Sequence, residues 1–336
     1  MGTLQSGRRN ALLMAAGLFA ARDAAAVIPP ETGPPLAAAI VVAGPPQGRL
    51  DRWADLLVPA LARVFPGASN LARSSVARST VGGSDGVTGA NQFQARVALD
   101  GGTALLLPGS AAMAWLIGDP RAQFDVGRWV PAWAGLCSAV LVSRGPLRPG
   151  HPLRVGGALP AGATLPALLA LDMLRIDVTP ADDSSADAVF HYGQGARAAA
   201  AQSGMTPVLT LGTVDAAGAW LRDPAFPAVP TVIEAVSNQV SSPALLAALR
   251  ATAAATVLDA ALVLPQLSPA NRVALWRRAC AEASVIAGMM AAAAALGIRP
   301  VPPPATATIM AAIAADAPTV LALRSWLDAR WGWRPG

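Results

Sequence analysis

Four glycine-rich turns hold the residues whose types and spacing are best suited to chemistry. Their sequences are GPPQGRLD (44–51), GGSDGVTGA (82–90), PGSAA (108–112) and LPAGATLP (159–166). Glycine lets the backbone turn its N–H groups inward, and the positive end of a helix dipole favours an anion such as a carboxylate. Anion binding by backbone amides is therefore the expected chemistry, although a purely structural turn explains 44–51 equally well.

The candidate ligand-binding residues come from these turns and from one strand end. Gly48 and Asp51 are expected to set the geometry of the first loop and its helix. Arg49 is interpreted as a solvated side chain, and attraction of a ligand by its charge is the alternative. Tyr192 ends an apolar strand, where it is either a structural aromatic or part of a cleft wall. The full set of candidates is Pro46, Gln47, Gly48, Asp51, Gly82, Gly83, Gly109, Ser110, Gly162, Ala163, Thr164 and Tyr192.

Catalytic, cofactor and metal sites find little support in the sequence. The turn at 82–90 lacks both the GK[ST] of a P-loop and the acid that follows a dinucleotide-binding fingerprint. Ser110 and His191 could be combined with an aspartate into a triad, but no G-x-S-x-G elbow is present. The sequence has two histidines and no zinc-type spacing, so we expect no metal, no cofactor and no catalysis. Cys137 and Cys280 are interpreted as buried small side chains rather than as a disulfide.

Composition indicates a folded, exported protein. Of the 336 residues, 54% are apolar and 13% charged, which excludes a disordered chain. The segment 1–26 has a basic start, an apolar run at 11–20 and a cleavage-type sequence ending at Ala26, so it predicts a signal peptide and a periplasmic protein, with Sec and Tat export both open. No uncharged stretch is apolar enough to span a membrane. The net charge of +5 is too scattered to indicate nucleic-acid binding.

Alternating strands and helices must position these turns. Uniformly apolar segments such as 37–44, 103–107 and 260–265 predict strands of a parallel or mixed sheet that helices cover on both faces. The helix after the first strand is expected to use Asp51 as its N-cap and to be kinked or split at Pro59.

The last third of the sequence is rich in helical patterns. It predicts helices over 271–296 and 306–326, with a proline-rich connector at 301–305 between them. Two α/β blocks with turns at their strand ends suggest a cleft between two lobes.

Three motifs follow one another along the chain: VVAGPPQGRLDRWA, VALDGGTALLL and FPAVPTVIEA. Their order resembles the extracytoplasmic solute-binding proteins of tripartite tricarboxylate transporters, the Bug or TctC-like family. The first is similar to that family's P-x-x-G-G-x-x-D loop, the second to its D-G-Y-T-L-L-L strand, and the third to its P-D-V-P-T-V-x-E-A box. The matching residues are Gly48, Asp51, Asp100, Gly101, Thr103, Pro227, Val229, Pro230, Thr231, Val232, Glu234 and Ala235.

This resemblance implies an α/β, type II periplasmic-binding-protein fold in which two lobes close on a ligand cleft. The first lobe would comprise 27–139 and 259–336, and the second 140–258. The family also implies a monomer that captures a small organic anion and docks the membrane permease subunits of a tripartite tricarboxylate transporter. The chain has Gln47 in place of a family glycine and lacks the V-P-Y-K-G segment of the second lobe. A ligand-sensing or interaction paralogue for a membrane receptor is therefore the alternative.

Overall fold

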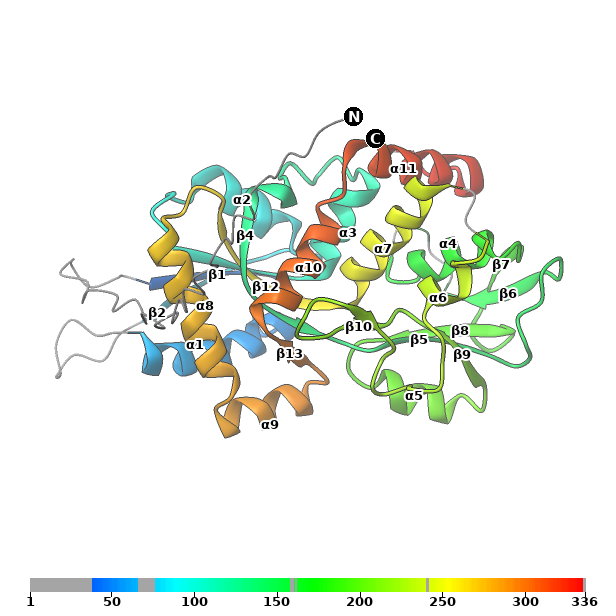
Figure 1. Cartoon of the computed structure of the whole chain (residues 1–336), viewed down its shortest axis with the longest axis horizontal. Coiled ribbons are helices and arrows are strands. Elements are labelled where there is room, and N and C mark those ends of the chain that lie inside the picture. The colour runs from blue at the N-terminus through cyan, green and yellow to red at the C-terminus, as the bar shows by residue number, and fades with distance from the viewer. Residues whose placement is uncertain (1–37, 66–75, 158–159, 161, 240–241, 335–336) are drawn as a thin grey trace, which may run out of the picture. The chain divides into compact units, whose positions relative to one another are not determined.

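The computed structural model describes residues 38–65, 76–157, 160, 162–239 and 242–334 (Figure 1). The signal peptide expected over 1–26 lies outside the described residues. Two β-sheets are each packed with helices, so the predicted α/β fold with two lobes is confirmed. The parts of the chain built on the two sheets are called the first and second lobes below.

The first lobe is built on a six-stranded mixed sheet. Its strand order is β13-β4-β12-β3-β1-β2, with β1 parallel to β2 and β3, and β12 antiparallel to β3 and β4. The strands are β1 (Ala38–Ala43), β2 (Val76–Val81), β3 (Thr103–Leu107), β4 (Trp129–Leu136), β12 (Leu258–Pro265) and β13 (Arg299–Val301). The strands predicted at 37–44, 103–107 and 260–265 are thus confirmed.

Both faces of this sheet are buried, which explains why its central strands are apolar throughout. On β3, Leu106 packs on one face with Trp53 and Trp276, whereas Leu105 and Leu107 pack on the other face. Alternate residues of a strand point to opposite faces, so a strand covered on both sides needs apolar residues throughout. The helices of this part are α1 (Arg49–Val64), α2 (Val87–Arg96), α3 (Gly109–Ile117), the 3-10 helix η1 (Val126–Arg128), α8 (Ala270–Ser284), α9 (Ala287–Ala295) and α10 (Pro303–Ile313).

The second lobe has a five-stranded sheet of order β7-β6-β8-β5-β9. Its strands are β5 (Ala139–Ser143), β6 (Leu153–Gly156), β7 (Val178–Ala181), β8 (Ala188–Tyr192) and β9 (Thr206–Thr210). A short ribbon pairs β10 (Thr213–Val214) with β11 (Trp220–Leu221). The helices in this part of the chain are α4 (Leu165–Met173), α5 (Ala196–Gln202), α6 (Val232–Val236) and α7 (Pro243–Val257).

The chain passes from the first sheet to the second between β4 and β5, and returns where α7 runs directly into β12. Both crossings adjoin the boundaries expected between the lobes. The C-terminal helix α11 (Ala317–Trp331) also reaches α4, because Trp326 Nε1 donates to Asp172 Oδ2 over 2.8 Å. The assignment of all of 259–336 to the first lobe therefore stays a prediction.

Helix α1 contradicts the expected N-cap and the expected split at Pro59, while the kink expected as the alternative to a split stays a prediction. Its N-cap is Gly48, so the prediction that Asp51 caps the helix is wrong; Asp51 lies in the first turn and its carboxylate accepts hydrogen bonds from the preceding loop and from β2. The helix also continues through Pro59 without splitting. Buried residues on both sides of the proline, such as Leu57 and Leu61, anchor the helix more strongly than one missing hydrogen bond weakens it.

Each of the two long helices predicted near the C-terminus is a pair of shorter helices. The predicted 271–296 is α8 and α9, bent by 78°, and the predicted 306–326 is α10 and α11, bent by 58°. A new helix starts at α11 because Asp316 accepts a hydrogen bond from the N–H of Thr319. Helix α10 begins within 301–305, so that segment is not merely a connector. Among the described residues, no single helix has the length and apolar character to cross a membrane, although each of these bent pairs meets both criteria when taken together.

Candidate functional site

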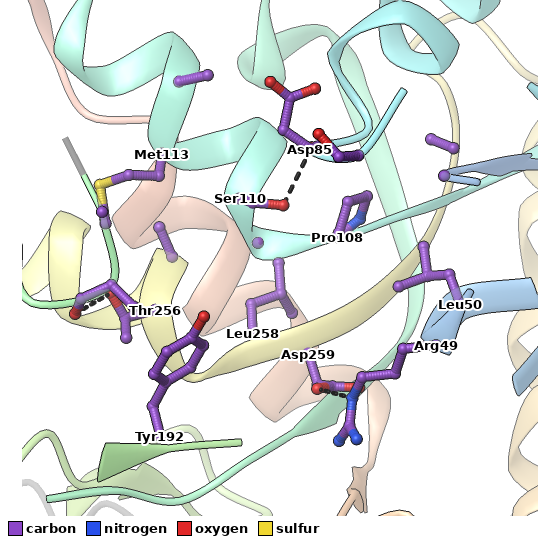
Figure 2. A pocket seen from close by; sticks show the side chains of 18 of the residues that line it. Arg49, Leu50, Asp85, Pro108, Ser110, Met113, Tyr192, Thr256, Leu258 and Asp259 are labelled. Atoms are coloured by element: carbon purple, nitrogen blue, oxygen red, sulfur yellow. Dashed lines mark hydrogen bonds and ion pairs between the residues drawn. The ribbon is translucent and has the colours of Figure 1, made fainter. Parts of the chain in front are cut away.

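A cavity of about 520 Å³ lies between the lobes, where several of the predicted turns meet (Figure 2). The first lobe lines it with the β1–α1 and β2–α2 turns, with α3 and with the segment after α3. The second lobe contributes the turn before α4 and the end of β8, and the passage from α7 into β12 also borders it. This volume is in the range of small-molecule sites.

Five of the twelve candidate residues line the cavity: Gly109, Ser110, Gly162, Ala163 and Tyr192. These residues come from both lobes, so the fold brings together the turn at α3, the turn before α4 and the end of β8. No ligand tests their binding role, which stays a prediction.

The other seven candidates lie outside the lining. They are Pro46, Gln47, Gly48, Asp51, Gly82, Gly83 and Thr164. In the first-lobe turns, neighbouring residues such as Pro45 and Ser84 line the cavity instead, and Thr164 is the N-cap of α4. Ligand contact by these seven residues also stays a prediction.

The candidate set from the sequence omits the charged residues of the cavity, although Arg49 was considered and interpreted as solvated. These charged residues are Arg49, Asp85, Asp119, Arg121 and Asp259. For Asp259 a local signal existed, because it is the single charged residue in the otherwise apolar strand LDAALVLP. A carboxylate in a buried strand needs a partner, and that requirement points to a site.

The N-terminus of α3 is held against the passage from α7 into β12. Gly109 is the first residue of α3, and a Cβ there would lie 2.0 Å from the carbonyl oxygen of Ala255 and 2.3 Å from that of Leu258. The next residue, Ser110, donates its hydroxyl to the backbone oxygen of Asp85 over 3.0 Å (Figure 2). The first turn of α3, which carries the positive end of the helix dipole, therefore borders the cavity.

The β1–α1 turn is held in place by Asp51. Its buried carboxylate accepts from the N–H of Gln47 and from the hydroxyl of Thr80, both over 2.8 Å. Burial alone would raise the pKa of Asp51, but these hydrogen bonds and the positive charge of Arg78 outweigh it, and the pKa lies below its ordinary value. Gln47 has a φ of 61°, the left-handed region that favours the glycine of the similar motif. Asp51 thus positions the turn from outside the cavity.

We expect Asp51→Asn to destabilise the protein by about 1–3 kcal/mol at neutral pH. The amide has one acceptor oxygen where the carboxylate has two, so one buried donor loses its partner. Because folding lowers the pKa of Asp51, its stabilising effect is present above the unfolded value of about 3.9 and is lost as the pH falls through the lower, folded value. Urea unfolding of both proteins at neutral and acidic pH measures the effect.

The difference between wild type and Asp51→Asn should shrink in acid. Asp55→Asn, at an exposed position of the same helix that also pairs with Arg78, is the matched control. A stability difference that does not depend on pH would contradict this role of Asp51.

Arg49 and Asp259 form an ion pair in the cavity wall (Figure 2). Arg49 Nε donates to Asp259 Oδ1 over 2.6 Å, while its other nitrogens donate to the Gln194 side chain over 3.1 Å and to the Leu296 carbonyl over 2.6 Å. Gln194 belongs to the second lobe and donates to the carbonyl of Ala295 over 2.7 Å. The interpretation of Arg49 as a solvated side chain is wrong, because its contacts tie α1 to β12 and one lobe to the other.

The deeper side of this ion pair is closed to solvent. The Asp259 side chain is 8% exposed, and its Oδ2 has no hydrogen-bond partner in the described part of the chain. Burial raises the pKa of Asp259, against the opposing influence of Arg49.

Burial also raises the pKa of Cys137 in the cavity wall to about 12, so Cys137 remains a thiol and not a nucleophile at neutral pH. Cys137 and Cys280 are both free and buried, as the sequence predicted.

A second group of charges surrounds Arg121. Its Nη2 lies 2.8 Å from Asp85 Oδ2 and 2.6 Å from Asp119 Oδ2. Hydrogen bonding to Arg121 holds the pKa of the Asp119 carboxyl below its ordinary value despite partial burial. Asp119 is therefore ionised at neutral pH, and it shares the guanidinium group of Arg121 with Asp85.

Neither the triad conceivable from the sequence nor a group of metal ligands is assembled in the described part of the chain. Ser110 donates to a backbone carbonyl, and His191 does not line the cavity, so the triad conceivable from the sequence does not form. In the same described ranges, no group of three or more His, Cys, Asp and Glu side chains is placed to hold a metal ion. The geometry favours binding by backbone amides and charged side chains.

Solved structures of known proteins resemble this chain, whereas the comparisons of its sequence find no match. No protein-family model and no curated protein sequence matches the chain. A TctC solute-binding protein from Polaromonas without ligand aligns with a TM-score of 0.62 and 14% identity, over 85% of this chain and 97% of that chain. The periplasmic binding protein BugD aligns with a TM-score of 0.50 and 13% identity, over 87% of this chain and 97% of that chain. R. palustris Rpa4515 with adipate aligns with a TM-score of 0.51 and 14% identity, over 86% of this chain and 97% of that chain.

These similarities confirm the fold that the three sequence motifs predicted. They extend over most of this chain and nearly all of each solved structure. The chain therefore has the two-lobed fold of the TctC- and Bug-type periplasmic solute-binding proteins.

Proposed function

We propose that the protein is an extracytoplasmic solute-binding protein that captures a small carboxylate-type metabolite by lobe closure. The observation that carries the proposal is the cavity of about 520 Å³, to which each lobe contributes a helix start: Gly109 and Ser110 in α3, and Gly162 and Ala163 just before α4. Helix N-termini offer N–H donors and a positive dipole end, and both favour a carboxylate. The adipate in the R. palustris structure of the same fold supports this ligand class.

Lobe closure couples ligand capture to delivery. A ligand that touches the starts of both α3 and α4 makes all of its contacts only when the lobes are together. Its differential affinity therefore shifts the population toward the closed form. The two crossings between the sheets are the natural hinge, because few residues there need to change their backbone angles.

Location and partners belong to the same proposal. The segment 1–26 directs the chain to the periplasm and is removed near Ala26, and the closed, liganded protein docks the permease subunits of a tripartite tricarboxylate transporter. The protein acts as a monomer that binds and releases its ligand unchanged. The fold shared with the periplasmic binding protein BugD supports the location.

A thermal-shift screen tests the proposed function. The purified protein is heated with succinate, glutarate, adipate, citrate, aromatic acids and amino acids, each beside the amide that lacks its carboxylate charge as the matched control. A ligand at a hundred times its Kd adds about 2.7 kcal/mol of stability, so at least one acid should raise the Tm by several degrees while its amide does not. If no acid raises the Tm, or if the amides raise it equally, the proposed function is wrong.

A further inference from the structure

One side chain of the second lobe joins two groups of the first lobe. Gln194 lies in the turn between β8 and α5, and its side-chain oxygen accepts from Arg49 Nη1 over 3.1 Å. Its side-chain nitrogen donates to the carbonyl of Ala295 over 2.7 Å. A side-chain amide has both an acceptor and donors, so it can make both hydrogen bonds at once. Gln194 therefore fastens the start of α1 and the end of α9 to the second lobe.

The end of α9 is shaped to receive this amide. The last carbonyls of a helix have no partner within the helix. At α9, the carbonyl of Ala295 accepts from Gln194. The next carbonyl, that of Leu296, accepts from Arg49. Gly297 follows with a φ of 65°, and a Cβ added there would lie 3.1 Å from Gln194 Cα and 3.6 Å from Gln194 Cβ. The glycine thus lets the backbone of the second lobe approach the end of α9 closely.

This contact lies at the edge of the cavity. Arg49 lines the cavity, and so does Tyr192, which is two residues before Gln194. Cys137 also lines it and is 2% exposed. The Cys137 thiol is within electrostatic reach of Arg49 and within hydrogen-bonding reach of the Gly193 backbone. It therefore lies close to the Gln194 contact and is shielded from solvent while the lobes are together.

Elsewhere the two lobes share an apolar core. One continuous cluster of buried side chains includes residues of α3, α4, α7 and α11, among them Leu116, Leu168, Leu249 and Leu327. Separating these side chains would expose apolar surface to water. The exposed side chain of Gln194, in contrast, can exchange its partners for water at a small net cost. The lobes should therefore part first at Gln194.

From these observations we propose that Gln194 is a latch: it holds the lobes together at this edge of the cavity, and the cavity opens there when its amide releases the end of α9. The inference goes beyond the proposed function, because it concerns how the lobes are held and released rather than what they bind. Passage of any molecule into or out of the cavity at this edge then requires release of the latch.

The two cysteines of the chain are built-in probes for this release. Opening at Gln194 uncovers the Cys137 thiol, and a thiol in water has an ordinary pKa and reacts with alkylating agents. Cys280 is buried in the core between α1, α8 and the first sheet, so its thiol is uncovered by unfolding and not by opening at Gln194. Cys137 therefore reports opening together with unfolding, and Cys280 reports unfolding alone.

Alkylation of the two cysteines in Gln194→Met tests the latch. Methionine keeps the length of the side chain and removes both hydrogen bonds. Iodoacetamide is added at mildly alkaline pH to the protein without ligand, and mass spectrometry follows each cysteine separately. Cys137 should react at least about tenfold faster in Gln194→Met than in wild type, while the rate for Cys280 stays the same. Gln202→Met, at an exposed position of α5, is the matched control and should leave both rates unchanged.

A disulfide between the lobes tests the contact itself. Gln194→Cys is combined with Gly297→Cys, because a Cβ at position 297 would lie 3.6 Å from that of residue 194, which suits a disulfide. Both are made together with Cys137→Ser, so that the native thiol cannot compete. Mild oxidation without ligand should link the two lobes. The matched control replaces Gln194→Cys by His151→Cys, which precedes β6 and so lies at the opposite edge of the sheet from the end of β8; it should stay reduced.

Each outcome decides the inference. Equal alkylation of Cys137 in wild type and Gln194→Met overturns the latch. Equal acceleration of Cys137 and Cys280 also overturns it, because the substitution then lowers overall stability. A disulfide variant that is folded by circular dichroism but stays reduced contradicts the contact, and if that variant does not fold, the alkylation rates decide. No ligand enters these experiments, so failure of every acid in the thermal screen removes the proposed function and leaves this result standing.

Discussion

Arg49→Met is expected to lower the free energy of unfolding by about 3 kcal/mol. The substitution keeps an apolar stem but leaves the Asp259 carboxylate, 8% exposed, without its cation. It also removes the hydrogen bond to Gln194 that joins the lobes and the hydrogen bond to Leu296 within the first lobe. Breaking a buried ion pair costs more than the intact pair contributes, because the remaining charge stays desolvated. Urea unfolding at neutral pH measures this loss.

Two companion variants make the Arg49 result specific. Arg52→Met, at an exposed position of the same helix, should change stability by less than about 0.5 kcal/mol. Combining Arg49→Met with Asp259→Leu should recover most of the loss, because both charges are then absent. A loss in Arg49→Met no larger than that in Arg52→Met would contradict the role given to the ion pair.

The loss in Arg49→Met should also depend on pH. Burial already raises the pKa of Asp259, and without Arg49 it rises further. A group with a raised carboxyl pKa binds a proton more readily in the folded state, so stability is gained as the pH falls through that value. The loss should therefore be smaller in mild acid than at neutral pH.

Gly109→Ala is expected to cost about 3 kcal/mol and to abolish ligand binding. The added Cβ would lie 2.0 Å from the carbonyl oxygen of Ala255, so the backbone of α3 or of α7 must move. Movement of α3 withdraws its N–H groups from the cavity edge. Urea unfolding measures the stability, and a thermal shift with the best acid from the screen measures binding.

Gly288→Ala is the matched control for Gly109→Ala. It lies in α9 with open space around the added Cβ, so it should raise stability by up to about 1 kcal/mol through helix propensity. A Gly109→Ala protein with wild-type stability and wild-type binding would show that the start of α3 neither needs glycine nor takes part in the site.

The sequence predicted the elements whose signal is local. The uniformly apolar strand 103–107 matches β3 because both faces of that strand are buried. The PTVIEA box is explained by a capping box at α6: Thr231 Oγ1 accepts from the N–H of Glu234, and the Glu234 carboxylate accepts from the N–H of Thr231. The prediction of a single helix over 306–326 was wrong because a local signal was overlooked, namely the N-cap Asp316 at which α11 starts.

The site was predicted only as far as its backbone turns. Ser110 and Ala163 were found because glycine-rich turns at helix starts have a recognisable composition. The ion pair of Arg49 and Asp259 was missed because its partners lie 210 residues apart and no local pattern connects them. No expectation from the sequence covered helix α7, yet its end forms part of the cavity wall.

Calorimetric titration of wild type and Ala163→Trp, with the acid that best stabilises the protein, tests the ligand cavity most directly. Ala163 borders the cavity from the second lobe, and an indole there would occupy the space between the lobes. The wild type should bind one equivalent of the acid per chain, and Ala163→Trp should show no measurable heat while keeping the ligand-free Tm. Equal affinity in the two proteins would place the ligand elsewhere and contradict the account.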